Sequence, residues 1–300
     1  MNRISRREFV AFAATGATAA AFALNQEPAH AAATLTARDV IDRIKKNTRV
    51  EWKPETATVD GVKAGDPATV VTGIVTTSMA TIEVLTQAVK SGANLVITCE
   101  PTFYSKSDLA APAAGRAADP VFAAKNAFIE KNHLVVWRFH DHWRLRAPEP
   151  FSQGLADALG WSGFTAADDP SRVTIPPVTL EALASELKAK LHARGGIRVV
   201  GDRQLKVQRI GMLPGTTAIQ ASLELLPAVD VIIAGEVREW ETVEYARDEV
   251  TGGQKKALIT IGRVLSEDPG MDVCARWLKT IVPEIATKRI PAGDPYWRPV

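Results

Sequence analysis

The residues of this chain that are best suited to chemistry follow directly after short apolar stretches. Cys99 and Glu100 end the apolar run in LVITCEPTFY, and Pro101 then restricts the turn. Glu236 follows VIIAG in the same way, and Glu267 closes the stretch ALITIGRVLSE. Thiolates and carboxylates are ligands for divalent metal ions, and a carboxylate can also act as a general base. These positions therefore indicate a metal site or a hydrolytic site, with Glu236 and Glu267 as candidate catalytic groups.

A second group of candidate ligands lies in the apolar stretch LVVWRFHDHW, which contains His140, Asp141 and His142. If this stretch is a strand, alternate residues face the same way, so His140 and His142 project together. Such a pair suits a metal ion or a phosphate group. The alternative is that aromatic neighbours pack beneath the histidines and leave both as satisfied hydrogen-bonding groups. The sequence leaves both interpretations open.

Two similar halves of the chain must position these candidates. Residues 69–100 and 208–236 each read as an apolar strand, a Thr-rich turn, a helix and a second apolar strand that ends in glutamate. Each half continues with a third apolar strand, within 134–143 and 257–267, and then with a helix. Continuous apolar strands that alternate with helices predict largely parallel sheets covered on both faces. We therefore predict an α/β fold of two related α/β domains produced by internal duplication.

The domain boundaries follow from this repeat. We place the first α/β domain at residues 32–165, and a linker helix with the second α/β domain at residues 166–300. In parallel sheets, reactive groups gather beyond the carboxyl ends of the strands. Glu100, Glu236 and the segment 263–267 occupy that place, so we expect the site in the crevice between the domains. Taken singly, each glutamate has a simpler alternative role, which is to cap the positive end of a following helix.

The first 31 residues read as a processing segment rather than as part of the fold. Arg6 and Arg7 precede a weakly apolar stretch of small residues, and an A-x-A cleavage pattern ends at Ala31. This order is typical of a twin-arginine signal peptide, so we expect export to the periplasm or the exterior. No other stretch has about 18 consecutive apolar residues, and we expect no membrane span in the mature chain.

Charge and cysteine content limit the partners and crosslinks of the chain. The formal net charge is +2 over 300 residues. No basic stretch is interleaved with aromatic residues, so we expect no nucleic-acid partner. Cys99 and Cys274 could form one disulfide in an oxidising compartment. Cys274, however, lies in the helical pattern MDVCARWLKTIV, which favours a buried and unpaired thiol.

Four motifs together resemble those of a known family. They are GANLVITCEP early in the chain, HDHWR before a helix that ends in Leu-Gly, AVDVIIAGE in the second half, and GRVLSE near the end. The pattern is similar to the Ngg-interacting factor three family, whose dinuclear-metal members are sometimes labelled GTP cyclohydrolase I type 2. The resemblance covers most of residues 36–290. It implies two linked α/β domains, a pair of divalent metal ions between them and often a hexameric ring.

The resemblance, carried across residue by residue, changes the expected metal site. Cys99 and Glu100 stand where the family has two histidines, and both types can still donate a ligand. Arg144 replaces an aspartate ligand and Arg263 replaces a histidine ligand, whereas Glu267 keeps its place. A guanidinium group cannot coordinate a metal ion. We therefore expect at most one ion, zinc, manganese or iron, with Arg263 in place of the second cation.

The ligands of that ion would come from thiol, imidazole and carboxylate side chains: Cys99, Glu100, His140, Asp141, His142 and Glu267. His140 falls on the histidine of the family's second motif. The alternative is a metal-free pocket in which Arg263 and Glu267 form an ion pair.

Three functions remain open on the sequence. The first is hydrolysis of a small anionic substrate by a water molecule that the metal activates, with Glu236 or Glu267 as the base. The second is non-catalytic binding of a metal or small ligand, with Arg263 and the histidines holding an anion. The third is a structural homo-oligomer that has lost its site. The chain has no Gly-x-Ser-x-Gly elbow and no Walker motif, so neither of those chemistries is expected.

Overall fold

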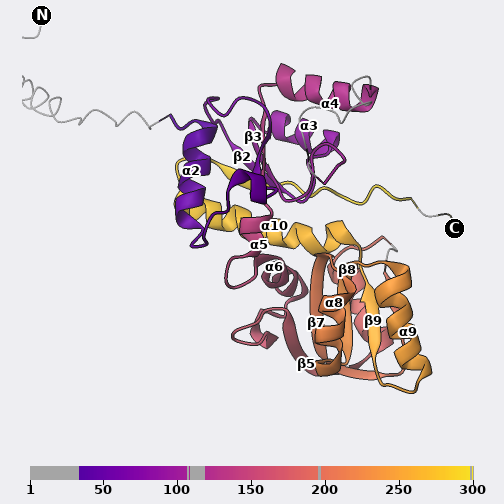
Figure 1. The fold of residues 1–300 in the computed structure, drawn as a ribbon. Coiled ribbons are helices and arrows are strands. Elements are labelled where there is room, and N and C mark those ends of the chain that lie inside the picture. Colours follow the sequence, from indigo (N-terminus) through magenta and orange to yellow (C-terminus); the bar gives the residue numbers. More distant parts are fainter. Residues whose placement is uncertain (1–33, 107, 109–118, 195–196, 298, 300) are drawn as a thin grey trace, which may run out of the picture. The chain divides into compact units, whose positions relative to one another are not determined.

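The computed structural model describes residues 34–106, 108, 119–194, 197–297 and 299. Helices and two sheets make up this part of the chain (Figure 1). The export signal that the sequence predicts at residues 1–31 lies outside the described residues. Within the described ranges, none of the helices combines the length and the hydrophobicity that a transmembrane segment needs.

The first sheet has five strands, of which four are parallel. Its order is β1-β4-β3-β2-β10, and β1 pairs antiparallel with β4 at one edge. In this order the strands are Gly61–Ala64, Val135–Arg138, Leu95–Thr98, Ile74–Thr77 and Thr287–Arg289. Every residue of β2, β3 and β4 is buried. This explains why these strands are continuous apolar runs in the sequence.

Helices cover both faces of the first sheet. They are α2, α3, α4 and α10, with the bounds Ala37–Asn47, Ile82–Lys90, Pro120–Lys131 and Arg263–Ile281. α3 and α4 share a core with Val75 and Val96. α2 and α10 share a second core with Ile74 and Leu95. Because successive strand residues face opposite sides, these two cores lie on opposite faces of the sheet.

The second sheet repeats this arrangement. Its order is β5-β7-β8-β9-β6, with the three central strands parallel and both edge strands antiparallel. In this order the strands are Arg172–Thr179, Lys206–Thr216, Val231–Glu236, Ala257–Thr260 and Arg198–Val200. Its helices α6, α7, α8 and α9 have the bounds Pro150–Leu159, Leu180–Lys190, Ile219–Leu225 and Glu244–Thr251. α6 and α7 share a core with Ile233, whereas α8 and α9 share a core with Ile232 on the other face.

The remaining helical segments among the described residues are short. They are Glu55–Ala57, Ser162–Phe164 and Leu226–Ala228 as 3-10 turns, Glu239–Val243 as a π-helix, and α5 at Asp141–Arg144.

The predicted repeat is present in the fold. Residues 69–100 contain β2-α3-β3 and residues 208–236 contain β7-α8-β8. A third parallel strand follows in each half, β4 or β9, and helices follow it. The prediction of an α/β fold with two mostly parallel sheets is confirmed, and the matching element order is consistent with internal duplication.

One predicted strand is shorter than expected. The stretch 134–143 forms β4 only as far as Arg138, and α5 begins at Asp141. His140 and His142 are therefore not alternate residues of a strand. The expectation that they project together, which depended on strand geometry, is wrong.

α10 packs against both sheets. It begins directly after β9 and contacts β7 and β8 as well as β2 and β10. A Cβ atom at Gly154 of α6 would lie only 2.4 Å from the backbone carbonyl group of Pro269 in α10, so these helices cross closely. The chain then continues into β10, which pairs with β2 of the first sheet. Residues 166–300, which we assigned to the second domain, thus also supply a strand to the first sheet.

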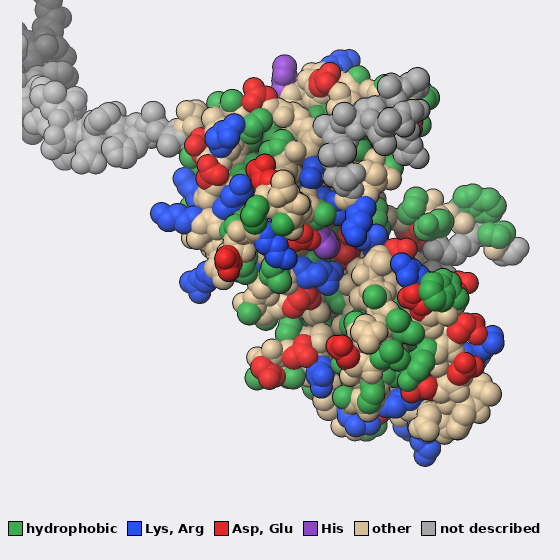
Figure 2. Space-filling model, in the orientation of Figure 1, with side chains coloured by type: hydrophobic (Ala, Val, Ile, Leu, Met, Phe, Trp, Pro, Cys, Tyr) green, Lys and Arg blue, Asp and Glu red, His purple; other side chains and the backbone are tan. Residues whose placement is uncertain are grey.

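Charged side chains of both signs are interspersed on the face that Figure 2 shows. Inside the protein, Cys99 and Cys274 are both buried and free.

Candidate metal centre

Cys99 and Glu100 lie where β3 leaves the first sheet. The backbone N–H of Cys99 donates to the carbonyl oxygen of Thr77 over 3.3 Å, and that of Glu100 donates to the carbonyl oxygen of Ser78 over 2.9 Å. The Sγ of Cys99 also lies 3.4 Å from the Ser78 oxygen. The parallel pairing of β2 and β3 thus continues past the strand ends. It holds both side chains in a buried position, with Glu100 only 2% exposed.

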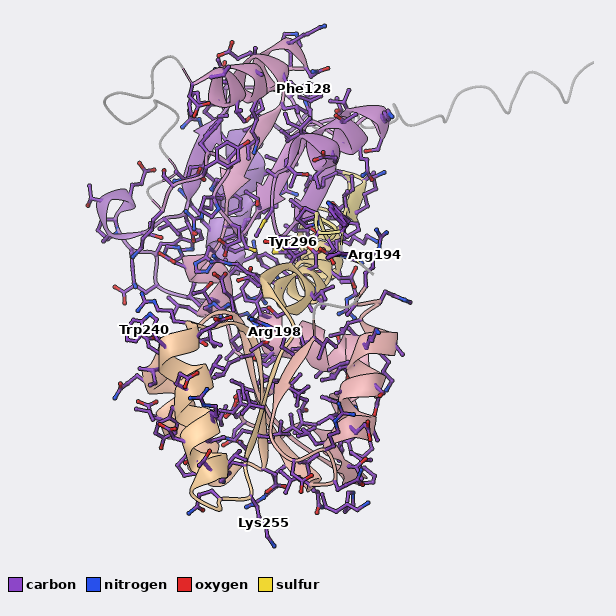
Figure 3. All side chains as sticks on the ribbon, turned by 90° about the vertical axis from the view of Figure 1, so that its right-hand side faces the viewer. Phe128, Arg194, Arg198, Trp240, Lys255 and Tyr296 are labelled. Carbon is purple, nitrogen blue, oxygen red and sulfur yellow. The ribbon has the colours of Figure 1, made fainter. Side chains whose placement is uncertain are left out.

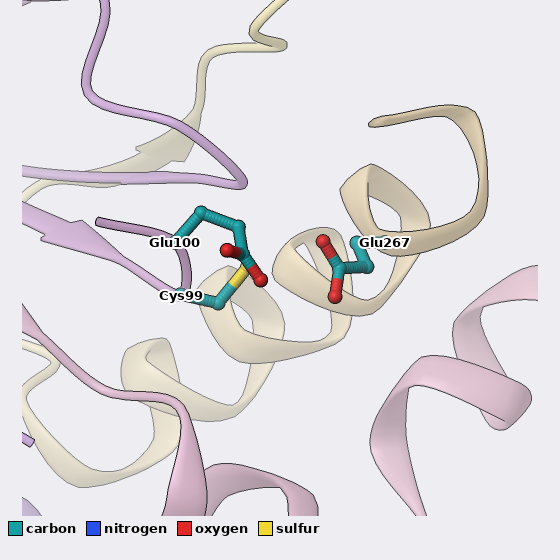
Figure 4. Close-up of side chains that lie close together, drawn as sticks. All are labelled: Cys99, Glu100 and Glu267. Atoms are coloured by element: carbon teal, nitrogen blue, oxygen red, sulfur yellow. The ribbon is translucent and has the colours of Figure 1, made fainter. Parts of the chain in front are cut away.

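Glu267 reaches the same place from α10. Neither of its buried carboxylate oxygens has a hydrogen-bond partner among the described residues. The Sγ of Cys99 and one carboxylate oxygen from each of Glu100 and Glu267 lie within 4.8 Å of one another. Figure 4 shows the three side chains approaching one another from the end of β3 and from α10. Because a buried carboxylate without a partner is costly, this arrangement fits a bound cation.

Burial changes the acidity of two of these groups. Burial and the neighbouring Glu100 carboxylate raise the pKa of Glu267 to about 8, against the opposing charges of Arg263 and Arg144. Burial also raises the pKa of the Cys99 thiol well above its usual value, and the two carboxylates add to this effect. In the absence of a cation, both groups therefore hold their protons at neutral pH. A divalent cation would favour the thiolate and the carboxylate.

Two arginines lie next to this group. Nη2 of Arg263 donates to Oε1 of Glu100 over 2.7 Å, and its Nε lies 3.6 Å from Oε2 of Glu267. Nη2 of Arg144 lies 3.7 Å from Oε1 of Glu267 and donates to the carbonyl oxygen of Pro214 over 3.2 Å. The arginine side chains are 32% and 33% exposed, whereas the carboxylate side chains are 2% and 1% exposed. The two arginine side chains are thus partly exposed, whereas the two carboxylates are buried.

Carboxylates outnumber guanidinium groups in this cluster. Four glutamates lie within 4.0 Å of one or both arginines: Glu100, Glu149, Glu236 and Glu267. When all are ionised, four negative and two positive charges leave a net charge of −2. One divalent cation would offset this excess.

The predicted histidine ligands lie outside the group. Within the part of the chain that the structure describes, no second set of three Cys, His, Asp or Glu side chains has this close spacing. Asp60 instead accepts hydrogen bonds from the backbone N–H groups of His140, Asp141 and His142, over 2.6, 2.9 and 2.9 Å. These hydrogen bonds satisfy the backbone N–H groups at the start of α5, where β4 has already ended.

His142 is fully buried, and both of its ring nitrogens are engaged. Nδ1 lies 2.6 Å from Oδ2 of Asp60, and Nε2 accepts a hydrogen bond from the backbone N–H of Lys53 over 2.9 Å. The ring of Trp52 stacks on the imidazole with 3.7 Å between centroids. In this arrangement His142 has no nitrogen left for a metal ion. Its role as a hydrogen-bonding group is the alternative that the sequence left open.

Asp141 and His140 are paired with each other. Nδ1 of His140 lies 2.9 Å from Oδ1 of Asp141, while Oδ2 of Asp141 accepts hydrogen bonds from the Thr58 hydroxyl and the Val59 N–H. Burial opposes ionisation, but these hydrogen bonds prevail and lower the pKa of Asp141 to about 2. The Asp141 carboxylate is therefore already engaged by local donors and is not part of the close group around Cys99.

Glu236 lies at the outer rim of the cluster. Its side chain is 55% exposed and lies 3.7 Å from Nη1 of Arg263, and it accepts a hydrogen bond from the Thr216 hydroxyl over 3.0 Å. Figure 3 shows Trp240, which follows β8, at the end of the second sheet away from Lys255, which precedes β9. The rim is thus at the carboxyl ends of the parallel strands, as we expected for α/β sheets.

Our sequence analysis missed Asp60, Ser78 and Gly215. Gly215 has a φ of 83°, and a Cβ atom there would lie 2.5 Å from Oε1 of Glu267 and 2.9 Å from Nη2 of Arg144. A glycine at a strand end is a known sign of close backbone approach, and this was the available signal. Asp60 and Ser78 act through contacts with distant segments, for which the sequence has no local signal.

Comparison with known proteins identifies a matching family and solved structures with a similar fold. The family model described as Duf34/NIF3 (NGG1p interacting factor 3) matches residues 35–291. A comparison with curated proteins found no match. Similar solved structures include Staphylococcus aureus protein SA1388, with a TM-score of 0.68 and 15% identity over 89% of this chain and 100% of that chain. A Bacillus cereus protein related to NIF3 has a TM-score of 0.67 and 14% identity over 88% and 99% of the two chains. The protein ybgI, of unknown function, has a TM-score of 0.64 and 21% identity over 87% and 100%.

Proposed function

The chain belongs to the Duf34/NIF3 family, and from this premise we propose that it binds one divalent metal ion through Cys99, Glu100 and Glu267. The observation that carries the proposal is the Glu267 carboxylate, which is buried without a hydrogen-bond partner among the described residues. It lies within 4.8 Å of a second carboxylate and of a thiol. A cation would satisfy these oxygens and neutralise the excess negative charge of the cluster.

One ion fits better than two. Arg144 and Arg263 place fixed positive charges 3.7 and 3.6 Å from the Glu267 carboxylate. Two-metal sites need several ligands for each ion with the ions about 3.5–4 Å apart. Neither guanidinium group can coordinate, so both occupy space and charge that a second ion would need.

Zinc is the ion that this donor set favours. A thiolate suits zinc and iron better than manganese, which prefers oxygen ligands. Three protein ligands with one open position are also the pattern of catalytic zinc sites. Zinc thus ranks first among the three ions that the sequence analysis allowed.

The finer proposal is a hydrolase that acts on a small anionic substrate. When bound, the ion would supply a Lewis acid at the floor of the site. Glu236 would accept the proton from water, because its carboxylate is half-exposed and lies outside the ligand group. Arg144 and Arg263 would orient the anionic substrate at the entrance. The second candidate is a binding protein without turnover, which the salt-bridged state of both arginines favours.

Metal analysis of the mature full-length chain tests the metal proposal. Protein purified without chelator should contain about one equivalent of zinc or, after exchange, bind one equivalent from solution. Glu267→Gln should lower the zinc affinity by about tenfold or more, because it removes a charged ligand. Glu244→Gln is the matched control, since this residue lies on α9 in an exposed ion pair with Arg247. Two tightly bound equivalents, or an unchanged affinity in Glu267→Gln, would contradict the proposal.

Turnover is tested separately from binding. Stimulation of phosphate-ester or amide hydrolysis by added zinc, and its loss in Glu236→Gln, would support the hydrolase. Tight zinc binding with no turnover of a broad substrate panel would support the binding protein.

We also propose export by the twin-arginine route and assembly into a homo-oligomer. The first rests on Arg6, Arg7 and the A-x-A pattern at Ala31, and the second on the family resemblance. A double variant with Arg6→Lys and Arg7→Lys should remain in the cytoplasm, whereas the parent sequence should be processed and exported. Light scattering of the processed protein should give the mass of an oligomer, and the mass of a single chain would contradict the assembly.

A further inference from the structure

We propose that Arg144 and Arg263 form an oxyanion subsite, which binds a phosphate or carboxylate group of the ligand at the mouth of the metal centre. This inference rests on the proposed metal function and names the part of the ligand that the arginines receive. The two guanidinium groups lie next to the two oxygens of one carboxylate: Nη2 of Arg144 is 3.7 Å from Oε1 of Glu267, and Nε of Arg263 is 3.6 Å from Oε2. Since one carboxylate separates them, an oxyanion of similar size can reach both.

Arg144 is held in a fixed orientation that leaves donors available. Its guanidinium group lies over the ring of Phe151, with 4.6 Å between Cζ and the ring centroid. Nη2 donates to the carbonyl oxygen of Pro214 over 3.2 Å. The distances to Glu267 and Glu149, 3.7 and 4.0 Å, are those of ion pairs and exceed hydrogen-bond length. A ligand oxyanion could accept shorter, charge-assisted hydrogen bonds from the same group.

Arg263 also has an unused donor. Its Nε is buried and has no hydrogen-bond partner among the described residues. Its Nη2 donates to Glu100 over 2.7 Å. A metal ion bound to Glu100 and Glu267 would compete with Arg263 for their negative charge. The Arg263 guanidinium group could then donate hydrogen bonds to an anion on the solvent side.

This arrangement requires metal and anion to bind cooperatively. Without the ion, the cluster of four glutamates and two arginines carries excess negative charge, which repels an anion. One divalent ion offsets much of this negative charge, so both arginines can act on the ligand. Metal binding should therefore raise the affinity for an oxyanion, and the oxyanion should raise the affinity for the metal equally.

The test is calorimetric titration of inorganic phosphate, and separately of acetate, into the full chain with and without zinc. Zinc-loaded wild type should bind at least one of the two anions, and metal-free protein should bind it more weakly. Tighter phosphate binding would identify a phosphoryl group, and tighter acetate binding a carboxylate. Arg144→Met should lower the anion affinity by about tenfold or more without changing the zinc stoichiometry. Arg172→Met is the control, because Arg172 lies in an exposed ion pair with Asp169.

A second measurement uses the wild-type chain, so it does not depend on the folding of a variant. Phenylglyoxal modification is mapped by mass spectrometry with and without phosphate. Phosphate should slow the modification of Arg144 and Arg263 but not that of Arg172. The subsite is overturned if the zinc-loaded wild-type chain binds neither anion. It is also overturned if zinc-loaded Arg144→Met binds the anion as tightly as the wild type does. Failure of the wild-type chain to bind zinc would instead contradict the proposed metal function.

Discussion

Two buried carboxylates, those of Asp60 and Glu267, differ in their hydrogen-bond partners. The carboxylate of Asp60 accepts hydrogen bonds from three backbone N–H groups and pairs with Nδ1 of His142, so both of its oxygens have partners within the protein. The carboxylate of Glu267 has no hydrogen bond among the described residues and depends on two arginines more than 3.5 Å away. A satisfied group such as Asp60 specifies structure, whereas an unsatisfied group such as Glu267 marks a place for a ligand.

The pKa of Glu267 predicts how the stability of the metal-free protein depends on pH. The folded protein holds this proton up to about pH 8, whereas the unfolded chain releases it near 4.5. Because the folded state binds more protons between these values, its free energy of unfolding should fall as pH rises from 4.5 to 8. Across this window the wild-type chain should lose unfolding free energy on the order of a few kcal/mol, and Glu267→Gln should not show this loss. Urea unfolding at pH 5 and pH 8.5, in chelator, measures the difference.

The control for this comparison is Glu244→Gln, which should keep the wild-type dependence on pH. Equal changes in unfolding free energy for wild type and Glu267→Gln would show that Glu267 is ionised in the folded protein at pH 5.

The contacts of His142 predict a structural role. His142→Ala would leave the Lys53 N–H unpaired and a cavity beneath Trp52, so we expect a loss of about 2–4 kcal/mol in unfolding free energy. The zinc stoichiometry of the folded variant should not change. His192→Asn, at an exposed residue, should leave both quantities at their wild-type values. Loss of zinc at a temperature where His142→Ala is still folded would restore His142 as a candidate ligand.

At the scale of elements, α10 decides the geometry of the centre. Its first turn carries Arg263 and its second turn carries Glu267, while its later turns pack on the first sheet. Thr76 of β2 donates a hydrogen bond to the carbonyl oxygen of Met271 over 2.7 Å, which fixes the helix to the strand that precedes Ser78. The distance between Glu267 and the end of β3 is therefore set by how α10 packs.

The crossing of α6 and α10 provides a test. Gly154→Ala would place a Cβ atom 2.4 Å from the backbone of Pro269. This overlap can be relieved only if α6 or α10 moves. We expect a loss of about 1–3 kcal/mol in unfolding free energy and a weaker zinc affinity, because Glu267 moves with α10. Gly163→Ala is the matched control, since a Cβ atom there meets no atom within 4 Å. Unchanged zinc affinity in a destabilised Gly154→Ala variant would argue against control of the site by α10.

At the scale of the whole molecule, the proposed ion joins residues that are far apart in sequence. Cys99 and Glu100 come from the first sheet, whereas Glu267 follows the last strand of the second sheet. An ion that binds only when all three meet binds the folded state and not the unfolded chain. Its binding free energy then adds to the stability of the fold.

Zinc should therefore raise the unfolding temperature of the wild-type chain. At a free zinc concentration of 100 times the Kd, the stabilisation should be about 2.7 kcal/mol. The same addition should have a smaller effect on Glu267→Gln and the full effect on Glu244→Gln. Differential scanning calorimetry at matched pH measures the shift, and an equal shift in all three proteins would indicate that zinc binds elsewhere.

Much of the fold was predictable, because its signals are local. The apolar runs before Cys99 and Glu236 are four to five residues long, and each is preceded by a helix with apolar spacing. The end of β4 was not predictable in the same way. The apolar stretch 134–143 reads as strand throughout, whereas β4 ends at Arg138 and the following backbone N–H groups donate to Asp60, about eighty residues earlier.

The sequence by itself determined the alternation of strands and helices, the repeat, and the acidic and thiol groups at strand ends. Each of these depends on neighbouring residues and on the periodicity of side chains along one element. The tertiary structure alone decided that Glu267 meets Cys99 and Glu100, that His142 bonds to Asp60, and that Thr287–Arg289 completes the first sheet. The physical reason is that these contacts join segments far apart in the chain, and their free energy depends on packing that no local pattern encodes.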